Sequence, residues 1–375
     1  MNIGVPRERK LGERRVGITP EGVKKLTSKS HTVRIETNAG ILSGFTDEQF
    51  ENAGAIISST LEDIWTKSEL VVKVKEPATE EFSYFRPGLA VFSFLHAAAL
   101  PEMTDALLRN NVIGIDYDLV TLDDGRLPIL EPMSEIAGKL SIQSGAYCLE
   151  AVKDGAGVLL GGTRTVPPAK VVVIGAGISG SNASLVADGM GANVVVFDIN
   201  QEKLANLRRK SPRIFTKQSS PEAISAELKD THLLIGAVLI PGALAPKLVT
   251  ASMIRSMPKG SVFVDICIDQ GGCSETSRPT SIQDPTYVVD GVIHYCVTNM
   301  PALVPRTSTQ ALTSETIEWI LLLAEKGIGN ACLSSEPLLR SVISLDGKLT
   351  NQAIGKALNK ESLSQLQAKA LLEKI

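Results

Sequence analysis

The chain has 375 residues, of which 43% are hydrophobic, with a formal net charge of −3 and a pI of about 5.9. This length allows two or three packed domains, and the weakly acidic balance argues against nucleic acid or an anionic membrane surface as a partner. The five cysteines form no CxxC pair, which argues against a disulfide framework and a zinc knuckle. No apolar run is long enough to span a bilayer, so we expect a soluble, cytoplasmic protein with reduced thiols and no metal.

The first part of the chain alternates short apolar strands with amphipathic helices. Strands are predicted at 2–5, 31–36, 55–57, 70–74, 89–94 and 112–115, and helices begin at Thr19-Pro20, Thr46, Thr60 and Pro101. Thr19 before Pro20 is typical of an N-cap with proline at the first helical position, and Thr46 with Gln49 is a capping box. This alternation predicts a mostly parallel, doubly wound sheet.

A turn-rich patch at 122–132 interrupts the alternation, and we expect a hinge near residue 128. A long helix is predicted at 133–152. Strands follow at 170–174, 193–197, 213–216, 231–239, 261–267 and, as a pair split by Asp290-Gly291, 287–297, with helices at 201–210, 221–228 and 246–257. From Thr307 the chain is predicted to be wholly helical, without a strand of its own.

The predicted fold is therefore α/β, with two Rossmann-like, doubly wound parallel-sheet domains separated by a cleft. The first part of a substrate domain is assigned to residues 1–128. A dinucleotide-binding domain follows at 129–305, and C-terminal helices at 306–375 are expected to return to the first domain.

The strongest motif is the stretch 170–200, which predicts a strand, a glycine turn, a helix and a second strand. Gly175, Gly177 and Gly180 form GxGxxG where the first strand turns into the helix. The first glycine permits a tight turn, the second lets the backbone approach a pyrophosphate, and the third lets the helix pack on the strand. The N–H groups and dipole of such a helix start favour phosphate.

The second strand of this stretch ends at Asp198, about 20 residues past the glycines, where the fingerprint expects an acid on the ribose hydroxyls. A carboxylate there repels a 2′-phosphate, and no arginine immediately follows it. The sequence therefore predicts NAD rather than NADP as the cofactor.

Polar residues also end apolar strands elsewhere, at the edge where open α/β sheets bind ligands. Lys75 follows LVVKV, His96 ends LAVFSFLH, and Asp269 ends SVFVDICID. Each alone is more often structural, but together they are consistent with hydride transfer, which needs a base and fixed charges to orient the substrate. Arg14 and Arg15 are further candidates for binding a substrate carboxylate, and their spacing does not distinguish them.

Long blocks of the sequence, in matching order over nearly the full length, resemble alanine dehydrogenases. These blocks include ERRVGITPEGV, KVKEP, EPMSEIAGKL, VIGAGISGSNAS, GAVLIPGALAPKLV, DICIDQGGCSETSRPT and HYCVTNMPALVPRTST. The resemblance implies NAD-dependent, reversible oxidative deamination of L-alanine to pyruvate and ammonium, and assembly as a homo-oligomer, commonly a hexamer. FSFLHAAA and IDYDLV depart from the family's usual FTYLHLAA and Tyr-Glu stretches. We expect these differences to affect side-chain packing and the range of amino acids accepted as substrates, rather than the type of reaction.

The resemblance also implies residue roles. Arg15 and Lys75 match the substrate-carboxylate pair, His96 the acid/base histidine and Asp269 the catalytic aspartate. The other positions that match the lining of the NAD site, beyond the three glycines, are Ser134, Asp198, Lys203, Ser219, Val238, Leu239, Ile266, Cys267, Ile268, Asp269, Arg278, Val297, Thr298, Asn299 and Met300.

Two alternatives remain. One is a nicotinamide-nucleotide-binding subunit of a proton-translocating transhydrogenase, although the chain has SEIAGKLSIQSGA in place of the Arg- and Gln-rich loop of those proteins. The other is a catalytically silent NAD-binding regulator. The joint presence of Arg15, Lys75, His96 and Asp269 argues against the second.

Overall fold

The computed structural model describes residues 1–238 and 244–375. The chain divides into two compact units, Met1–Met133 with Ala302–Ile375, and Ser134–Pro301. The sequence analysis places these boundaries after residues 128 and 305. Within the described residues, no helix combines the length and apolar character that crossing a membrane requires.

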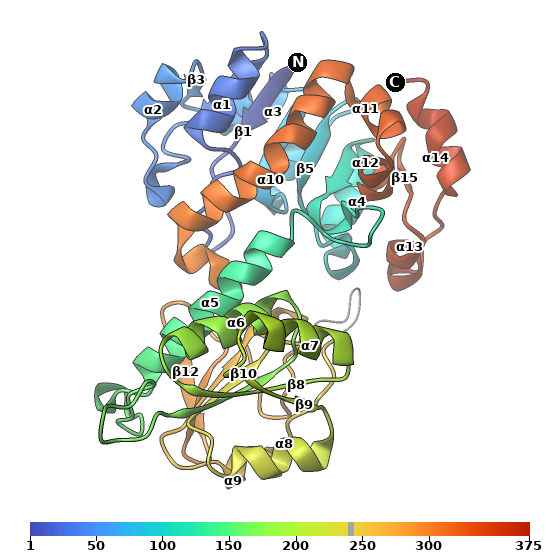
Figure 1. Cartoon of the computed structure of the whole chain (residues 1–375). Coiled ribbons are helices and arrows are strands. Elements are labelled where there is room, and N and C mark those ends of the chain that lie inside the picture. The colour runs from blue at the N-terminus through green and yellow to red at the C-terminus, as the bar shows by residue number, and fades with distance from the viewer. Residues whose placement is uncertain (239–243) are drawn as a thin grey trace. The chain divides into compact units, whose positions relative to one another are not determined.

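The first unit is built on an 8-stranded sheet with the order β15-β14-β6-β5-β4-β1-β2-β3 (Figure 1). Its strands are β1 (Asn2–Val5), β2 (Thr32–Glu36), β3 (Ile56–Ser58), β4 (Leu70–Lys75), β5 (Ala90–Phe94), β6 (Ile113–Asp116), β14 (Val342–Leu345) and β15 (Lys348–Leu349). From β1 the chain runs outward to β3, then crosses back to β4 and runs outward to β6, with parallel pairing throughout. The switch point of this doubly wound sheet lies between β1 and β4.

The helices of the first unit begin largely where the sequence predicts. They are α1 (Pro20–Thr27), α2 (Asp47–Asn52), α3 (Leu61–Thr66), α4 (Pro101–Arg109), α10 (Pro305–Lys326), α11 (Ile328–Ser334), α12 (Glu336–Ser341), α13 (Gln352–Leu358) and α14 (Gln365–Leu372). Thr19 caps α1 through a bond from the Gly22 N–H, and the capping box of Thr46 and Gln49 opens α2, as predicted. Trp65 of α3 is fully buried in the core beneath these helices.

The prediction of a wholly helical C-terminal region is wrong. After α12, β14 pairs antiparallel with β6 and turns back into β15, which extends the first sheet. The turn is Asp346-Gly347, and both residues have positive φ. Four apolar residues are too few to distinguish a strand from a helix by periodicity, whereas Asp-Gly between apolar runs is a strong hairpin signal.

The second unit is built on a 7-stranded sheet with the order β12-β13-β11-β10-β7-β8-β9. Its strands are β7 (Lys170–Ile174), β8 (Asn193–Asp198), β9 (Phe215–Gln218), β10 (Leu233–Gly236), β11 (Val262–Asp265), β12 (Thr286–Val289) and β13 (Val292–Tyr295). All neighbours pair in parallel except β12 and β13, the hairpin predicted around Asp290-Gly291. The switch point lies between β7 and β10.

Helices cover both faces of this sheet, with α6 and α7 on one and α8 and α9 on the other (Figure 1). The helices are α5 (Glu131–Cys148), which begins in the first unit, α6 (Ile178–Gly189), α7 (Gln201–Lys210), α8 (Pro221–Leu228) and α9 (Ala251–Ser256). Both doubly wound sheets confirm the predicted fold class.

Helix α9 is shorter than the predicted 246–257, because the chain before it is extended. The Leu248 and Val249 N–H groups donate to the Cys273 carbonyl at 2.9 and 3.1 Å, and Thr250 then caps the helix. The predicted strand 231–239 also ends earlier, at Gly236, and Leu239 lies outside the described residues.

Candidate active site

The glycine turn after β7 has the geometry that the motif predicts. A Cβ on Gly180 would lie 1.8 Å from the Gly175 carbonyl oxygen, and one on Gly175, whose φ is +106°, would lie 2.2 Å from the Ala237 oxygen. Both positions therefore require glycine for packing. A Cβ on Gly177, the N-cap of α6, meets nothing within 4 Å. The space beside Gly177 and the N-terminus of α6 suits the pyrophosphate of a dinucleotide.

Asp198, the last residue of β8, connects this turn to the next strand. One carboxylate oxygen accepts the Ala176 N–H at 2.6 Å and the other accepts the Asn200 N–H at 2.7 Å. The Ser219 N–H donates to the Asp198 carbonyl at 3.1 Å, which places the end of β9 beside it. The acid thus stands next to the glycine turn, where the ribose of a nucleotide bound there would lie.

Most of the remaining residues assigned to the cofactor follow the carboxyl ends of parallel strands in this unit. Val238 follows β10, Ile266, Cys267, Ile268 and Asp269 follow β11, and Val297, Thr298, Asn299 and Met300 follow β13. Three others come from elsewhere: Ser134 lies in α5, and its carbonyl accepts the Ser179 hydroxyl of α6 at 2.9 Å. Lys203 is an exposed residue of α7, and exposed Arg278 stacks on the Tyr287 ring at 4.0 Å.

Asp269 is exposed in a 3-10 helix, Ile266–Gln270, directly after β11. Its two carboxylate oxygens accept the Asn299 N–H at 3.1 and 3.3 Å. Asn299 has a φ of +56°, a left-handed conformation that asparagine tolerates better than most residues. The turns after β11 and β13 are therefore joined at the residue assigned to catalysis.

In the first unit, the switch point between β1 and β4 carries charged groups. Lys75 is the last residue of β4. The buried carboxylate of Glu8, just beyond β1, accepts the Val74 N–H at 2.7 Å and the Lys75 N–H at 3.3 Å. It thereby ties the two switch-point strands together beneath Lys75.

Lys75 and His96 come together at this edge. The Lys75 Nζ lies 3.4 Å from the His96 Nε2, and the His96 Nδ1 lies 2.9 Å from a carboxylate oxygen of Asp118. A carboxylate only accepts hydrogen bonds, so Nδ1 carries the proton. The lone pair of Nε2 then points toward the lysine ammonium, and the His96 side chain keeps 35% of its surface exposed. This is the arrangement of a histidine that can take up a proton at Nε2.

The backbone also sets this histidine. His96 has a φ of +49°, a left-handed conformation that is uncommon for residues other than glycine, and its ring stacks on Phe94. Below it, buried Asp116 accepts the Leu95 and Asp118 N–H groups at 3.2 and 3.1 Å. Burial, with the charge of Asp118 as a smaller cause, raises the pKa of Asp116 to about 7.

Arg15 is only 2% exposed, and Glu13 holds one edge of its guanidinium group. Nε and Nη2 donate to the two Glu13 oxygens at 2.7 and 2.6 Å, a bidentate pair, while Nη1 lies 3.1 Å from the Met133 sulfur. A Cβ on Gly17 would lie 2.8 Å from the Val72 carbonyl oxygen, so this segment packs closely on β4. The structure thus distinguishes Arg15, held in place near β4, from its neighbour Arg14.

A buried lysine supports the same edge from below. Lys73 lies 3.2 Å from Glu81 and 3.5 Å from Glu8, and none of the three side chains is more than 2% exposed. Burial is the largest cause that raises the pKa of Glu8 to about 7; Lys73 lowers it and Glu13 raises it again. Lys73 therefore forms ion pairs with two buried carboxylates, Glu8 and Glu81.

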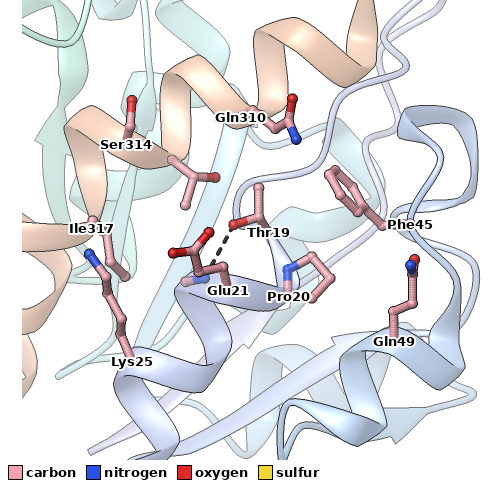
Figure 2. A pocket seen from close by; sticks show the side chains of 11 residues that line it. Thr19, Pro20, Glu21, Lys25, Phe45, Gln49, Gln310, Ser314 and Ile317 are labelled. Atoms are coloured by element: carbon pink, nitrogen blue, oxygen red, sulfur yellow. Dashed lines mark hydrogen bonds between the residues drawn. The ribbon is translucent and has the colours of Figure 1, made fainter.

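A separate pocket of 350 Å³ lies between α1 and α10 (Figure 2). Thr19, Glu21, Lys25, Phe45 and Gln310 are among its lining residues. The Thr19 hydroxyl already accepts the Gly22 N–H at 3.2 Å, and Glu21 adds negative charge to the first turn of α1. This helix start is therefore poorly suited to an anion, and none of the residues assigned to catalysis lines the pocket.

Comparison with protein families matches both units. Residues 4–137 match the N-terminal domain, and residues 141–352 the C-terminal domain, of the family described as alanine dehydrogenase/PNT. The chain belongs to the alanine dehydrogenase/PNT family. It is 49% identical to an alanine dehydrogenase of Mycolicibacterium smegmatis over 96% of this chain and 97% of the relative. It is 48% identical to an alanine dehydrogenase of Geobacillus stearothermophilus over 96% and 97%.

Solved structures agree with this family assignment. An L-alanine dehydrogenase superposes with a TM-score of 0.93 at 44% identity, covering 96% of this chain and 99% of that one. A transhydrogenase from Sinorhizobium meliloti superposes with a TM-score of 0.81 at 23% identity over 94% and 100%, a likeness of fold alone. The chain is thus more similar to this L-alanine dehydrogenase than to this transhydrogenase, in sequence and in fold.

Sequence reasoning missed Asp118, Asp116, Glu13 and Glu8, which hold the residues assigned to the site. One signal was available: Asp116 and Asp118 directly follow a predicted apolar strand, as Lys75 does. Glu13 and Glu8 lie in a loop with several other charges, and their spacing does not reveal which of them is buried.

Proposed function

We propose that this chain catalyses the reversible oxidative deamination of L-alanine by NAD, giving pyruvate, ammonium and NADH. The observation that carries the proposal is the His96 ring after β5, with Nδ1 on Asp118 and Nε2 toward Lys75, next to the switch point of the first sheet. It supplies a base and a cation within one hydrogen-bonded group. The high identity to alanine dehydrogenases over nearly the whole chain supports alanine as the substrate.

The alanine carboxylate is assigned to Arg15 and Lys75. Glu13 fixes the guanidinium of Arg15 in one orientation, so that little side-chain entropy is lost when a carboxylate binds. Lys75 is the more exposed of the two and offers an ammonium group beside His96. Holding the carboxylate orients Cα, which removes much of the entropic barrier to reaction.

Proton transfer is assigned to His96. After loss of hydride, the substrate is an iminium ion, and water must add to its carbon while losing a proton. Nε2 of His96 can take that proton, because Nδ1 is already protonated and its charge is balanced by Asp118. The same group can return the proton to the departing ammonia. Lys75, 3.4 Å away, is placed to share this proton.

NAD, when bound, supplies the hydride acceptor. Its proposed holders are the glycine turn and helix start at Gly175–Gly180, the acid at Asp198 and the turns after β10, β11 and β13. Asp269 is assigned the stabilisation of positive charge on the substrate nitrogen, and its bonds from the Asn299 N–H fix the carboxylate in place.

A direct assay tests the proposal. Purified protein is mixed with NAD and L-alanine, and the absorbance of reduced nicotinamide is followed. An increase in absorbance with NAD and alanine, without a second nicotinamide nucleotide, supports alanine dehydrogenase activity. Turnover that requires a second nicotinamide nucleotide would point instead to a transhydrogenase, and NAD binding without turnover would point to a silent regulator.

Two finer proposals accompany this one. The family resemblance supports a hexamer, which light scattering after gel filtration measures. A cytoplasmic location is supported by the five cysteines, all free and buried, and is tested by cell fractionation.

A further inference from the structure

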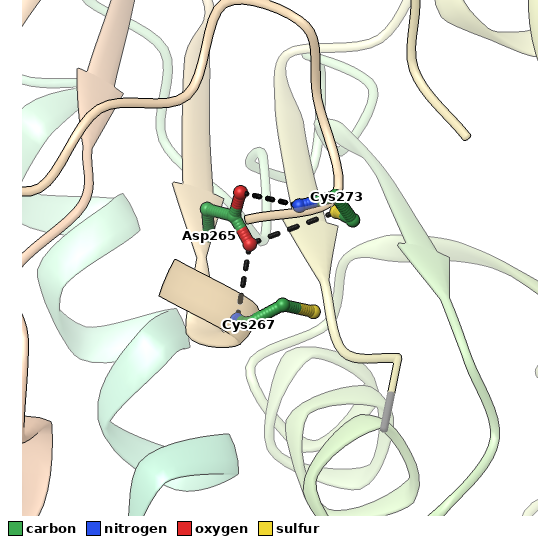
Figure 3. Close-up of side chains that lie close together, drawn as sticks. All are labelled: Asp265, Cys267 and Cys273. Atoms are coloured by element: carbon green, nitrogen blue, oxygen red, sulfur yellow. Dashed lines mark hydrogen bonds between the residues drawn. The ribbon is translucent and has the colours of Figure 1, made fainter. Parts of the chain in front are cut away.

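Three buried side chains at the end of β11 form a cluster, of which only Cys267 is also assigned to the NAD site. Asp265 ends β11, Cys267 lies in the following 3-10 helix, and Cys273 returns beside them (Figure 3). Their ligand atoms all lie within 4.8 Å of one another. We propose that Asp265, Cys267 and Cys273 bind a thiophilic divalent cation of the zinc class.

The chain path explains why spacing does not reveal this cluster. Five residues separate the cysteines, so no CxxC motif exists. Gly271 and Gly272 both have positive φ, +88° and +76°, and the Gly272 N–H donates to the Cys267 carbonyl at 3.0 Å. Two successive left-handed residues reverse the chain and bring Cys273 back to Asp265, a proximity that the spacing of the two cysteines does not predict.

The distances fit a tetrahedral ion. Zinc bonds of about 2.3 Å to sulfur and 2.0 to 2.2 Å to oxygen imply sulfur–oxygen separations of about 3.5 Å and sulfur–sulfur separations of about 3.8 Å. The Sγ of Cys273 lies 3.6 Å from an oxygen of Asp265. Since no pair exceeds 4.8 Å, an ion would draw the ligand atoms together by only about 1 Å.

The charge balance also favours an ion. Asp265 is fully buried, and its donors are neutral: the Cys267 and Cys273 N–H groups at 3.0 and 2.9 Å and the Ser277 hydroxyl at 2.5 Å. A divalent ion that displaces both thiol protons leaves the cluster's net charge unchanged, so no extra charge is buried.

The surrounding backbone is already arranged to hold two thiolates. The Cys267 sulfur accepts the Val238 N–H at 2.9 Å, a bond that strengthens when the sulfur is ionised. The carbonyl of Cys273 is held by Leu248 and Val249. An ion would therefore join the two ends of the 267–273 loop, which carries Asp269, with little movement of the backbone. The inference does not depend on the proposed activity.

Cadmium is a suitable probe, because cadmium thiolates absorb in the ultraviolet. Chelator-treated full-length protein in a phosphine reductant is titrated with Cd²⁺, and bound ion is counted after dialysis. We expect one tightly held ion per chain, release of two protons, a thiolate band, and displacement by Zn²⁺. Cys267→Ala and Cys273→Ser should each abolish the band, while Cys332→Ala, which removes a fully buried cysteine elsewhere, should keep it.

Folding is checked by circular dichroism and thermal unfolding without metal. If a variant does not fold, the wild-type protein is alkylated with and without cadmium instead. Cadmium should protect Cys267 and Cys273 from alkylation, and peptide mass spectrometry identifies the protected cysteines. Absence of retained ion in the folded wild type, protection of other cysteines, or equal binding by Cys273→Ser would overturn the inference.

Discussion

The two units use one topology to make two different kinds of edge. In each, a doubly wound sheet reverses its strand order, between β1 and β4 in one and between β7 and β10 in the other. At the first switch point the carboxyl ends carry buried and half-buried charges, among them Glu8 and Lys75. At the second switch point, the carboxyl ends of the strands carry Gly175 and the backbone of Ala237, and the N-terminus of α6 follows.

This difference shows how a fold sets where a ligand binds, while the side chains set which ligand. Backbone N–H groups and a helix dipole suit a phosphate of any nucleotide, and they need glycine because side chains would block the approach. Fixed charges suit a small carboxylate, but they must be paired to be buried. At the first edge, further residues are therefore needed to hold the proposed site residues in place: Glu13 binds Arg15, and Asp118 binds His96.

The largest effect is expected at the charged edge. His96→Ala removes the proposed base and should lower kcat by about 10²- to 10⁴-fold, because general acid–base catalysis supplies a factor of that size. NAD affinity, measured by fluorescence titration, should stay the same, since the dinucleotide residues belong to the other unit.

His31→Ala is the matched control, because that ring contacts the N-terminal amine rather than any residue of the proposed site. Its kcat should equal that of the wild type. Near-normal turnover of His96→Ala would remove His96 from catalysis.

Asp118→Asn tests whether the carboxylate sets the tautomer of His96. An amide can donate as well as accept, so Nδ1 is no longer forced to carry the proton. We expect kcat to fall by about 10²-fold, less than the roughly 10⁴-fold found for the equivalent change in serine protease triads, because Asp118 is partly exposed. Asp118→Glu should recover part of the rate, and a purely structural role would instead lower thermal stability in both variants without changing the pH profile of kcat.

Lys75→Ala should raise the KM for alanine by about 10- to 100-fold, because a hydrogen bond to a charged group contributes about 1.5 to 3 kcal/mol. The KM for NAD should change little. Lys10→Ala serves as the control, since its ammonium group binds the largely buried carboxylate of Glu76 at 2.7 Å rather than any residue of the proposed site. An unchanged KM for alanine in Lys75→Ala would exclude Lys75 from carboxylate binding.

At the glycine edge, two alanine substitutions separate packing from ligand approach. Gly180→Ala places Cβ against the Gly175 carbonyl and should lower stability by about 1 to 3 kcal/mol, the usual cost of overpacking. Gly177→Ala meets open space and should melt like the wild type but bind NAD more weakly. Thermal unfolding and NAD titration are measured for both variants. Equal melting temperatures and equal NAD affinities of the two variants would contradict this prediction.

The last prediction concerns the pH dependence of stability that the buried carboxylate of Glu8 causes. Folding raises the pKa of Glu8 from 4.5 to about 7, so between these values the folded protein binds a proton that the unfolded chain has released. The contribution of Glu8 to stability is thus present below pH 4.5 and is lost as pH rises toward 7. In denaturant titrations, the free energy of unfolding of Glu8→Gln should rise relative to that of the wild type between pH 4.5 and 7, by up to a few kcal/mol. A pH-independent difference would show that Glu8 does not titrate there.

The sequence alone predicts the parallel strands of both sheets, the glycine turn and the position of Lys75, His96 and Asp269 after strands, but not β14 and β15. Those features are local: a β-branched run followed by GxGxxG, or a lysine directly after LVVKV, has the same meaning wherever the strand lies. The hairpin at Asp290-Gly291 was found by its turn residues, and the equivalent signal at Asp346-Gly347 was overlooked because helices surround it.

Tertiary structure alone decided which charges are paired and which cysteines meet. Arg15 and Glu13 are near neighbours in sequence, yet their burial depends on the packing of the segment against β4. Asp118 contacts His96 from the 3-10 helix after β6, and Cys273 contacts Asp265 because two left-handed glycines reverse the chain. Local pattern determines secondary structure because backbone preference and hydrophobic period act over a few residues. Charge pairing and ligand clusters depend on distances across the sheet, which exist only after the strands have taken their order.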